Sequence, residues 1–195
     1  MKVIGLTGGI GMGKSTAAAA FRRAGIPVFD ADLSVHRMQA RGGRAVKAIG
    51  AAFPGSVKDN AVDRAALRAL VINDRDAFRR LERMLHPIVE QDAHDFIGRA
   101  RRAGKRAVVL DVPLLFEAKF DKLCDIAMVV SAPLAVQVHR VSLRRRMSKA
   151  DVLAIIARQM PDREKRRRAD VVIQTGLSRA HTLRALRRFI MGLHG

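Results

Sequence analysis

The sequence predicts an α/β fold, a doubly wound parallel sheet of five short strands with a helical insertion. Short apolar segments alternate with segments of helical period, a glycine-rich turn joins the first strand to the first helix, and strand signals vanish over residues 33–102. The chain has 195 residues, and 49% of them are apolar, which is enough for one core of ordinary size. Since no repeat or long linker interrupts it, one continuous globular unit is the simplest organisation.

The chain opens with a βαβ unit. Residues 2–7 form a continuous apolar run that is typical of a buried strand. Residues 15–24 are predicted as an alanine-rich helix that ends at Gly25, and residues 27–29 as a second strand. A strand, a helix and a second strand in this order indicate a parallel sheet.

Residues 33–102 follow a different pattern, in which segments of helical period succeed one another without a strand signal. Breaks between these helices are expected at Gly42-Gly43, at Pro54-Gly55 and at Pro87. This stretch is therefore predicted to be a helical insertion.

Strand signals resume with two apolar runs, residues 107–111 and residues 126–131. The second run leads into a further helix. A last short strand over residues 170–173 precedes a C-terminal helix over residues 178–191. Together with the opening unit, these segments give the five strands of the predicted sheet.

The strongest local signal is the run Gly-Gly-Ile-Gly-Met-Gly-Lys-Ser at residues 8–15, which fits GxxxxGK[ST] between a strand and a helix. Glycines let the backbone curl so that N–H groups point at phosphate oxygens, and the helix N-terminus adds partial positive charge. Lys14 is expected to reach the β- and γ-phosphates and Ser15 to bind Mg²⁺, while Met12 contributes its backbone N–H. The alternative is a turn that only closes the βα unit and leaves Lys14 in solvent.

Two carboxylates follow the second strand in the run Asp30-Ala31-Asp32, at the edge of a parallel sheet where ligands bind. One of them is predicted to accept the proton of a hydroxyl group that attacks the γ-phosphate. Alternatively, Asp30 or Asp32 caps the helix that begins near Leu33.

Arg140 and Arg144 lie four residues apart and therefore share one face of a helix. Facing a phosphate chain, they are expected to neutralise the charge that develops during phosphoryl transfer. Arg145 and Arg146 point elsewhere and are expected in solvent. The remaining basic runs are predicted as exposed helix faces, at residues 101–102, 166–168 and 187–188.

Charge and composition restrict the partners and the compartment. The chain has 37 Lys and Arg against 18 Asp and Glu, a net charge of +19, which favours phosphate-rich partners. No apolar run approaches the roughly 18 residues that cross a bilayer, and no secretory signal is recognisable, so we expect a cytoplasmic protein that does not contact membranes. Cys124 is the only cysteine, and we expect it to be a small buried side chain.

These motifs and several others make the chain similar to the dephospho-coenzyme A kinase family over nearly its whole length. The resemblance rests on residues 7–16, Asp30-Ala31-Asp32, Leu85-His86-Pro87, residues 111–117, Gln137 with Arg140 and Arg144, residues 159–161, residues 164–166, Ala169-Asp170 and Thr175-Gly176. It implies a P-loop NTPase fold and Mg²⁺ as the cofactor. It also implies phosphorylation of the ribose 3′-hydroxyl of dephospho-coenzyme A by ATP, the last step of coenzyme A biosynthesis.

The resemblance also implies parts and residue roles. The implied parts are a nucleotide-binding core over about 1–32, 105–139 and 169–195, a substrate-binding insertion over about 33–104 and a small lid over about 140–168. Asp32 is the implied base, and Lys14 and Arg140 hold the transferring phosphoryl group. The implied ATP-binding residues are Gly9, Gly11, Met12, Gly13, Lys14, Ser15, Thr16 and Arg144. The implied acceptor-binding residues are Thr7, Asp32, His86, Pro113, Leu114 and Leu115, and the implied metal ligand is Ser15.

One further carboxylate, Asp111, follows an apolar strand, where a carboxylate can orient Mg²⁺. We expect it outside the direct ligands of the ion, and the sequence leaves open whether it contacts the ion through water. Two other functions also stay open. A nucleoside or nucleotide monophosphate kinase would share the loop, the helical insertion and an arginine-bearing lid. A nucleic-acid-binding protein could use the loop for switching, but aromatic residues for base stacking are scarce, with eight Phe, no Trp and no Tyr. We therefore expect ATP and dephospho-coenzyme A as partners and no specific nucleic acid.

Overall fold

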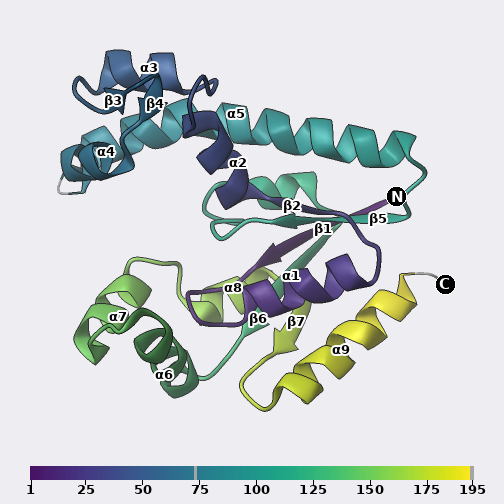
Figure 1. Cartoon of the computed structure of the whole chain (residues 1–195). Coiled ribbons are helices and arrows are strands. Elements are labelled where there is room, and N and C mark those ends of the chain that lie inside the picture. The colour runs from purple at the N-terminus through teal and green to yellow at the C-terminus, as the bar shows by residue number, and fades with distance from the viewer. Residues whose placement is uncertain (73, 194–195) are drawn as a thin grey trace. The chain divides into compact units, whose positions relative to one another are not determined.

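The computed structural model describes residues 1–72 and 74–193 (Figure 1). The chain forms two compact units, one of Met1–Phe29 with Ile97–Gly195 and the other of Asp30–Phe96. The first unit carries a five-stranded sheet, and the second is mainly helical. The core, insertion and lid boundaries that the resemblance implies stay predictions.

The five-stranded sheet has the order β2-β5-β1-β6-β7, with β1 in the centre. Its strands are β1 (Lys2–Thr7), β2 (Val28–Asp30), β5 (Ala107–Asp111), β6 (Ile126–Ser131) and β7 (Val171–Gln174). β1 pairs in parallel with β5, where Leu6 lies opposite Asp111, and with β6, where Thr7 lies opposite Val129. β6 in turn pairs in parallel with β7. The doubly wound parallel sheet predicted from the apolar runs is confirmed.

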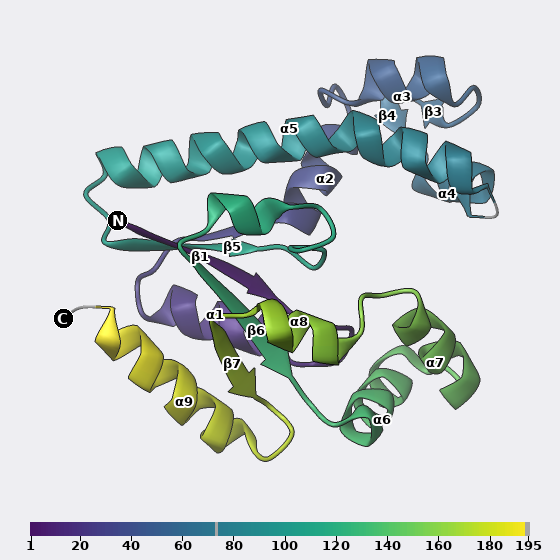
Figure 2. The same cartoon turned by 180° about the vertical axis from the view of Figure 1, so that it is seen from behind.

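The central strands are buried on both faces, which explains their continuous apolar sequences. Every residue of β5 is buried, and so is every residue of β1 after Lys2. Helices α1 (Lys14–Arg23) and α9 (Arg179–Gly192) cover one face (Figures 1 and 2), where Phe21 meets Phe189 edge to face, with 6.3 Å between the ring centroids. On the other face Leu115 packs on Gly5, where a Cβ atom would lie 2.9 Å from the leucine methyl groups.

The rest of the first unit is helical. A 3-10 helix, η1 (Phe120–Leu123), lies between β5 and β6, and three helices follow β6. They are α6 (Leu134–Arg145), α7 (Lys149–Ala157) and α8 (Asp162–Arg168). No helix in the described part of the chain is both long and apolar enough to span a membrane.

The second unit contains α2 (Ala31–Gln39), α3 (Val46–Ala52), α4 (Arg64–Val71) and most of α5 (Arg75–Arg102). It also holds an antiparallel hairpin of β3 (Val57–Lys58) and β4 (Ala61–Val62). The prediction that residues 33–102 contain no strand is therefore wrong. The hairpin turns at Asp59 and Asn60, whose φ values of 50° and 58° are those that a two-residue turn needs and that Asp and Asn tolerate.

The helix break predicted at Pro87 is also wrong, because α5 runs through it for 28 residues. A proline inside a helix removes one backbone hydrogen bond and costs about 3 kcal/mol. Leu81 is buried before Pro87, and Val89 and Ala93 are buried after it. Packing on both sides of the proline thus offsets the local cost and keeps the helix continuous.

Candidate phosphate-binding site

The glycine-rich loop lies between β1 and α1, as its motif predicts. Gly11 and Gly13 have φ values of +75° and +92°, a left-handed conformation that glycine adopts without steric cost. A Cβ atom on Gly11 would lie 2.6 Å from Cγ2 of Val141 on α6, so close packing also requires glycine there. α1 begins at Lys14, and its N-cap residue is Gly13, which has no side chain to cap the helix. The loop and this helix end therefore present backbone N–H groups suited to an anion.

Lys14 is held at the loop by a carboxylate. Its Nζ atom lies 2.6 Å from Oδ1 of Asp111, and the two side chains are 20% and 7% exposed. Asp111 is the last residue of β5 and lies opposite Leu6 of β1, so the parallel pairing brings it to the start of the loop. Contact between Lys14 and nucleotide phosphates stays a prediction.

Arg140 on α6 is tied to the turn that follows β7. Its Nη2 atom donates to the backbone oxygen of Thr175 at 2.7 Å. Thr175 is buried, and its Oγ1 atom donates to the backbone oxygen of Met12 in the loop, also at 2.7 Å. Thr175 therefore links Arg140 to the loop, whereas Arg144 is exposed in the last turn of α6. The phosphate contacts of both arginines stay predictions.

Two glutamines to which the sequence reasoning gave no role also touch the loop. Nε2 of Gln137 donates to the backbone oxygen of Ile10 at 2.7 Å, and the backbone N–H of Ile10 donates to Oε1 of Gln159 at 3.1 Å. Gln137 lies on α6, and Gln159 lies between α7 and α8. They are 127 and 149 residues from Ile10 in sequence, so no local pattern could have indicated these contacts.

The loop after β5 contains three of the predicted acceptor-binding residues, Pro113, Leu114 and Leu115. Thr7, a fourth, is fully buried, and its Oγ1 atom donates to the backbone oxygen of Pro113 at 2.9 Å. Leu115 is fully buried, while Leu114 is 39% exposed. Of the two leucines, Leu114 therefore offers the surface that a ligand can reach, and all four roles stay predictions.

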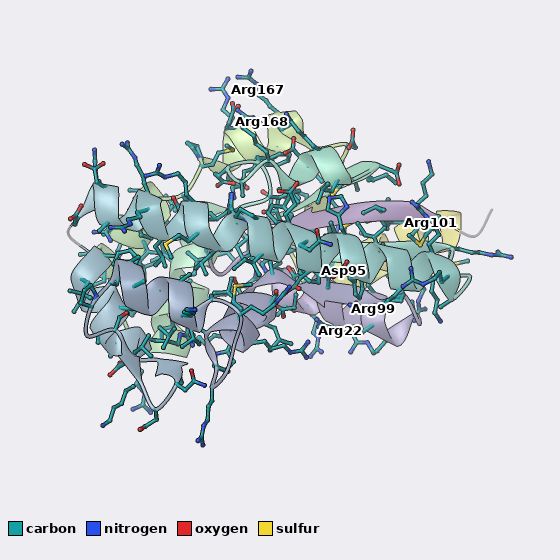
Figure 3. The ribbon with its side chains drawn as sticks, turned by 90° about the horizontal axis from the view of Figure 1, so that it is seen from above. Arg22, Asp95, Arg99, Arg101, Arg167 and Arg168 are labelled. Atoms are coloured by element: carbon teal, nitrogen blue, oxygen red, sulfur yellow. The ribbon has the colours of Figure 1, made fainter. Side chains whose placement is uncertain are left out.

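Lys165 of α8 contacts the same loop after β5, although it lies 52 residues further along the chain than Pro113. Its side chain is buried, and its Nζ atom lies 3.1 Å from the backbone oxygen of Pro113 and 3.0 Å from Oε1 of Glu117. Residues 166–168 are exposed as predicted, and Figure 3 shows Arg167 and Arg168 extending away from α8. The sequence alone does not distinguish Lys165 from these exposed neighbours.

A cavity of about 440 Å³ borders the loop within the first unit. Its walls include Gly9, Met12, Gln137, Gln159 and Asp162. Oδ2 of Asp162 accepts a hydrogen bond from Ser131 at 2.8 Å, while Oδ1 is buried and has no hydrogen-bond partner among the described residues. The cavity thus presents an acceptor that a water molecule or a ligand N–H can satisfy.

Asp32 and His86 belong to the second unit. Oδ1 of Asp30 accepts a hydrogen bond from the N–H of Leu33 at 3.0 Å, so Asp30 is the cap of α2. Asp32 lies exposed in the first turn of that helix, and the alternative that it acts as the cap is wrong. His86 is exposed on α5, in a groove also lined by Asp76, Arg79, Glu82 and Arg83. The proposed roles of Asp32 and His86 stay predictions.

Cys124 and Glu164 depart from their ordinary pKa. Burial, reinforced by the carboxylates of Asp121 and Asp125, raises the pKa of the half-buried Cys124 thiol from 9.0 to about 12. This thiol is therefore protonated at neutral pH, and the cysteine that we expected to be buried is half-buried. On the surface of α8, a hydrogen bond from Arg168 lowers the pKa of Glu164.

The oxygen atoms around Lys14 fit a magnesium ion. Ser15 follows Lys14 in the first turn of α1, and the ion pair with Lys14 holds the Asp111 carboxylate beside that turn. Mg²⁺ typically takes one or two protein oxygens and completes its shell with substrate phosphates and water. Within residues 1–72 and 74–193 no three His, Cys, Asp or Glu side chains gather into a metal site of their own. Ser15 would hold the ion, while the Asp111 carboxylate stays paired with Lys14 beside it.

A phosphate loop between the central strand of a parallel sheet and its first helix, with a lysine at the start of that helix, gives the chain the fold of a P-loop NTPase. Solved structures of two kinases share this fold. Shikimate kinase from Bacteroides thetaiotaomicron is 14% identical, covers 100% of this chain and 99% of its own, and has a TM-score of 0.54. Dephospho-CoA kinase from Campylobacter jejuni is 22% identical, covers 98% of this chain and 97% of its own, and has a TM-score of 0.67.

The particular family follows from the sequence. The family profile described as dephospho-CoA kinase matches residues 2–179, and the chain belongs to this family. The dephospho-CoA kinase of Paramagnetospirillum magneticum is 55% identical over 166 residues, which are 85% of this chain and 78% of that protein. The dephospho-CoA kinase of Gluconobacter oxydans is 48% identical over 188 residues, 94% of each chain. The crystal structure of TT1252 from Thermus thermophilus is 35% identical, covers 100% of this chain and 98% of its own, and has a TM-score of 0.85.

Proposed function

We propose that the protein transfers the γ-phosphoryl group of ATP to the ribose 3′-hydroxyl of dephospho-coenzyme A, giving coenzyme A and ADP, as the last step of coenzyme A biosynthesis. The observation that carries the proposal is the family match over residues 2–179 in a chain whose phosphate loop is intact. A nucleoside or nucleotide monophosphate kinase shares the loop but not this match over most of the chain.

Nucleotide binding would use the backbone N–H groups of the loop and the start of α1. An ammonium group has three N–H donors, and Asp111 takes one of those of Lys14, so the others stay available for β- and γ-phosphate oxygens. Arg140 would add positive charge from α6, where Thr175 holds its guanidinium group next to the loop. Charge delivered in this fixed geometry is the main means by which kinases stabilise a transferring phosphoryl group.

In the transfer step, the 3′-hydroxyl oxygen would attack the γ-phosphorus while Asp32 accepts the hydroxyl proton. A new oxygen–phosphorus bond forms as the bond to the bridging oxygen breaks, and ADP leaves with that electron pair. Asp32 is exposed and is not the cap of its helix, which leaves its carboxylate available for this role. A magnesium ion held by Ser15 supplies neutralisation of the β- and γ-phosphate charge when it is bound.

An acceptor assay tests the proposal. The purified protein is incubated with ATP, Mg²⁺ and either dephospho-coenzyme A or a panel of nucleosides and nucleoside monophosphates. We expect ADP release with dephospho-coenzyme A alone, a product heavier by one phosphoryl group, and phosphorus NMR that places the new ester at the 3′ position. Lys14→Met serves as the inactive control. Phosphorylation of the nucleotide panel only, or of a different hydroxyl of dephospho-coenzyme A, would overturn the proposal.

A further inference from the structure

Both polar backbone atoms of Ile10, at the top of the phosphate loop, are occupied by glutamine side chains. Gln137 donates to the carbonyl oxygen at 2.7 Å, and Gln159 accepts from the N–H at 3.1 Å. Gln137 is 2% exposed, and Gln159 is half-buried. Since α6 and the segment between α7 and α8 supply one glutamine each, two separate elements hold the same loop residue.

These contacts fix two consecutive peptide planes. In a trans peptide the C=O of one residue and the N–H of the next point in opposite directions. With the Ile10 carbonyl directed at Gln137, the N–H of Gly11 points away from that side chain. With the Ile10 N–H directed at Gln159, the carbonyl of Gly9 points away from Gln159, and this carbonyl accepts the N–H of Met12 at 3.1 Å inside the loop.

The neighbouring glycines make room for both amides. A Cβ atom on Gly9 would lie 3.0 Å from Nε2 of Gln137 and 3.3 Å from Oε1 of Gln159, and a Cβ atom on Gly11 would lie 3.0 Å from the backbone oxygen of Gln137. A side chain at either position would therefore push against the glutamines. The glycines of the motif thus serve this contact as well as the curl of the backbone.

We propose that Gln137 and Gln159 are positioning residues that hold the Ile10 backbone and so direct the adjacent loop N–H groups, that of Gly11 above all, toward nucleotide phosphates. The inference rests on the proposed function to the extent that this loop must bind a nucleotide. Neither glutamine needs to touch the ligand. A loop whose N–H groups already point at the phosphates binds them without first losing conformational freedom.

The two glutamines act through different halves of their amide groups. A carbonyl oxygen can only accept, so Gln137 must present its NH₂ group to Ile10, and an N–H can only donate, so Gln159 must present its oxygen. Glutamate retains the oxygen but has no donor. Gln159→Glu should therefore preserve the hydrogen bond with the Ile10 N–H. Gln159→Met and Gln137→Met should each lose one hydrogen bond to the Ile10 backbone.

The test measures ADP binding by calorimetry, the KM values for ATP and dephospho-coenzyme A, and hydrogen exchange of the Ile10 N–H. Gln159→Met and Gln137→Met should each raise the dissociation constant for ADP and the KM for ATP about tenfold, the effect of one lost hydrogen bond. The KM for dephospho-coenzyme A should stay unchanged. Exchange at Ile10 should be faster in Gln159→Met and return to the wild-type rate in Gln159→Glu.

Gln174 provides the control for added charge. It lines the same cavity, is exposed, and lies in β7. Gln174→Glu and Gln159→Glu should bind ADP equally, within about threefold of the wild type. Gln137 and Gln159 line the cavity beside the loop, and this cavity leaves space for the methionine side chains. Circular dichroism of each variant checks that it is folded.

Different results identify which proposal fails. Unchanged ADP binding in both methionine variants, or equal losses in Gln159→Glu and Gln159→Met, would overturn the positioning role. Wild-type protein that does not bind ADP would overturn both proposals. If ADP binding follows the predicted order while dephospho-coenzyme A is not phosphorylated, the proposed function fails and the positioning role stands.

Discussion

Replacing Lys165 by methionine tests whether the buried Lys165 side chain of α8 holds the loop after β5. The ammonium group lies 3.0 Å from Glu117, and the two side chains are 2% and 24% exposed. Removing one partner of a buried ion pair costs about 3–5 kcal/mol, because the other charge stays behind without compensation. Water reaches part of Glu117, and Thr7 still donates to Pro113, so we expect a loss of about 2–3 kcal/mol in the free energy of unfolding.

Urea unfolding followed by far-ultraviolet circular dichroism measures this loss, since the chain has no Trp or Tyr for fluorescence. Arg167→Met is the matched control on the same helix, because Arg167 is 74% exposed and its contact with Glu164 is 3.5 Å long. We expect less than about 0.5 kcal/mol from that change. Combining Lys165→Met with Glu117→Gln removes the stranded charge and should recover about half of the loss. If Lys165→Met is no more destabilising than Arg167→Met, the buried ion pair does not hold this loop.

Three further variants, one of them with Asp30→Asn as its control, address the proposed chemistry, and a fourth variant addresses the cysteine. Asp32→Asn should lower kcat about 10²- to 10⁴-fold while ADP binding persists, and Asp30→Asn, which keeps a capping oxygen, should retain turnover in the same steady-state assay. Arg140→Ala should lower kcat more than it raises the KM for dephospho-coenzyme A; a change confined to that KM would make it an acceptor-binding residue. Asp111→Asn should raise the KM for ATP without raising the concentration of Mg²⁺ needed for half-maximal activity. Burial raises the pKa of Cys124 above that of the unfolded chain, so its contribution to stability is complete below pH 9.0 and is lost as the pH rises toward about 12. Cys124→Ala should flatten this alkaline decline in urea midpoints measured across that pH range, and an unchanged decline would contradict the assignment.

Features encoded by neighbouring residues could be predicted from the sequence. The phosphate loop is one of them, because its glycines, Lys14 and the strand before it form one short stretch with a known spacing. The strands β1, β5 and β6 were equally predictable, since strands buried on both faces leave continuous apolar runs. The hairpin at Asp59 and Asn60 was missed because each of its strands has two residues, too few for an alternating pattern.

Contacts between distant parts of the chain could not be predicted in this way. Asp111 meets Lys14 across 97 residues, and only the register of two parallel strands brings them together. Lys165 lies in a run of basic residues whose composition indicates an exposed helix face, yet it alone among them is buried. Pro87 was predicted to break the helix, because proline disfavours a helix interior, but packing along α5 keeps the helix continuous there. In each case the deciding energy comes from tertiary contacts rather than from local preference.

The ion pair between Lys14 and Asp111 gives the carboxylate a role that does not depend on metal. A lysine side chain loses up to about 2 kcal/mol of rotamer entropy when it is fixed, and Asp111 imposes this loss before any nucleotide arrives. Affinity for the phosphates is then not reduced by ordering Lys14 during binding. Asparagine keeps an acceptor oxygen without the charge, so Asp111→Asn weakens this restraint and raises the KM for ATP. Had the carboxylate acted through Mg²⁺, the same variant would shift the Mg²⁺ requirement as strongly as Ser15→Ala, and that result would reject the restraint as its main role.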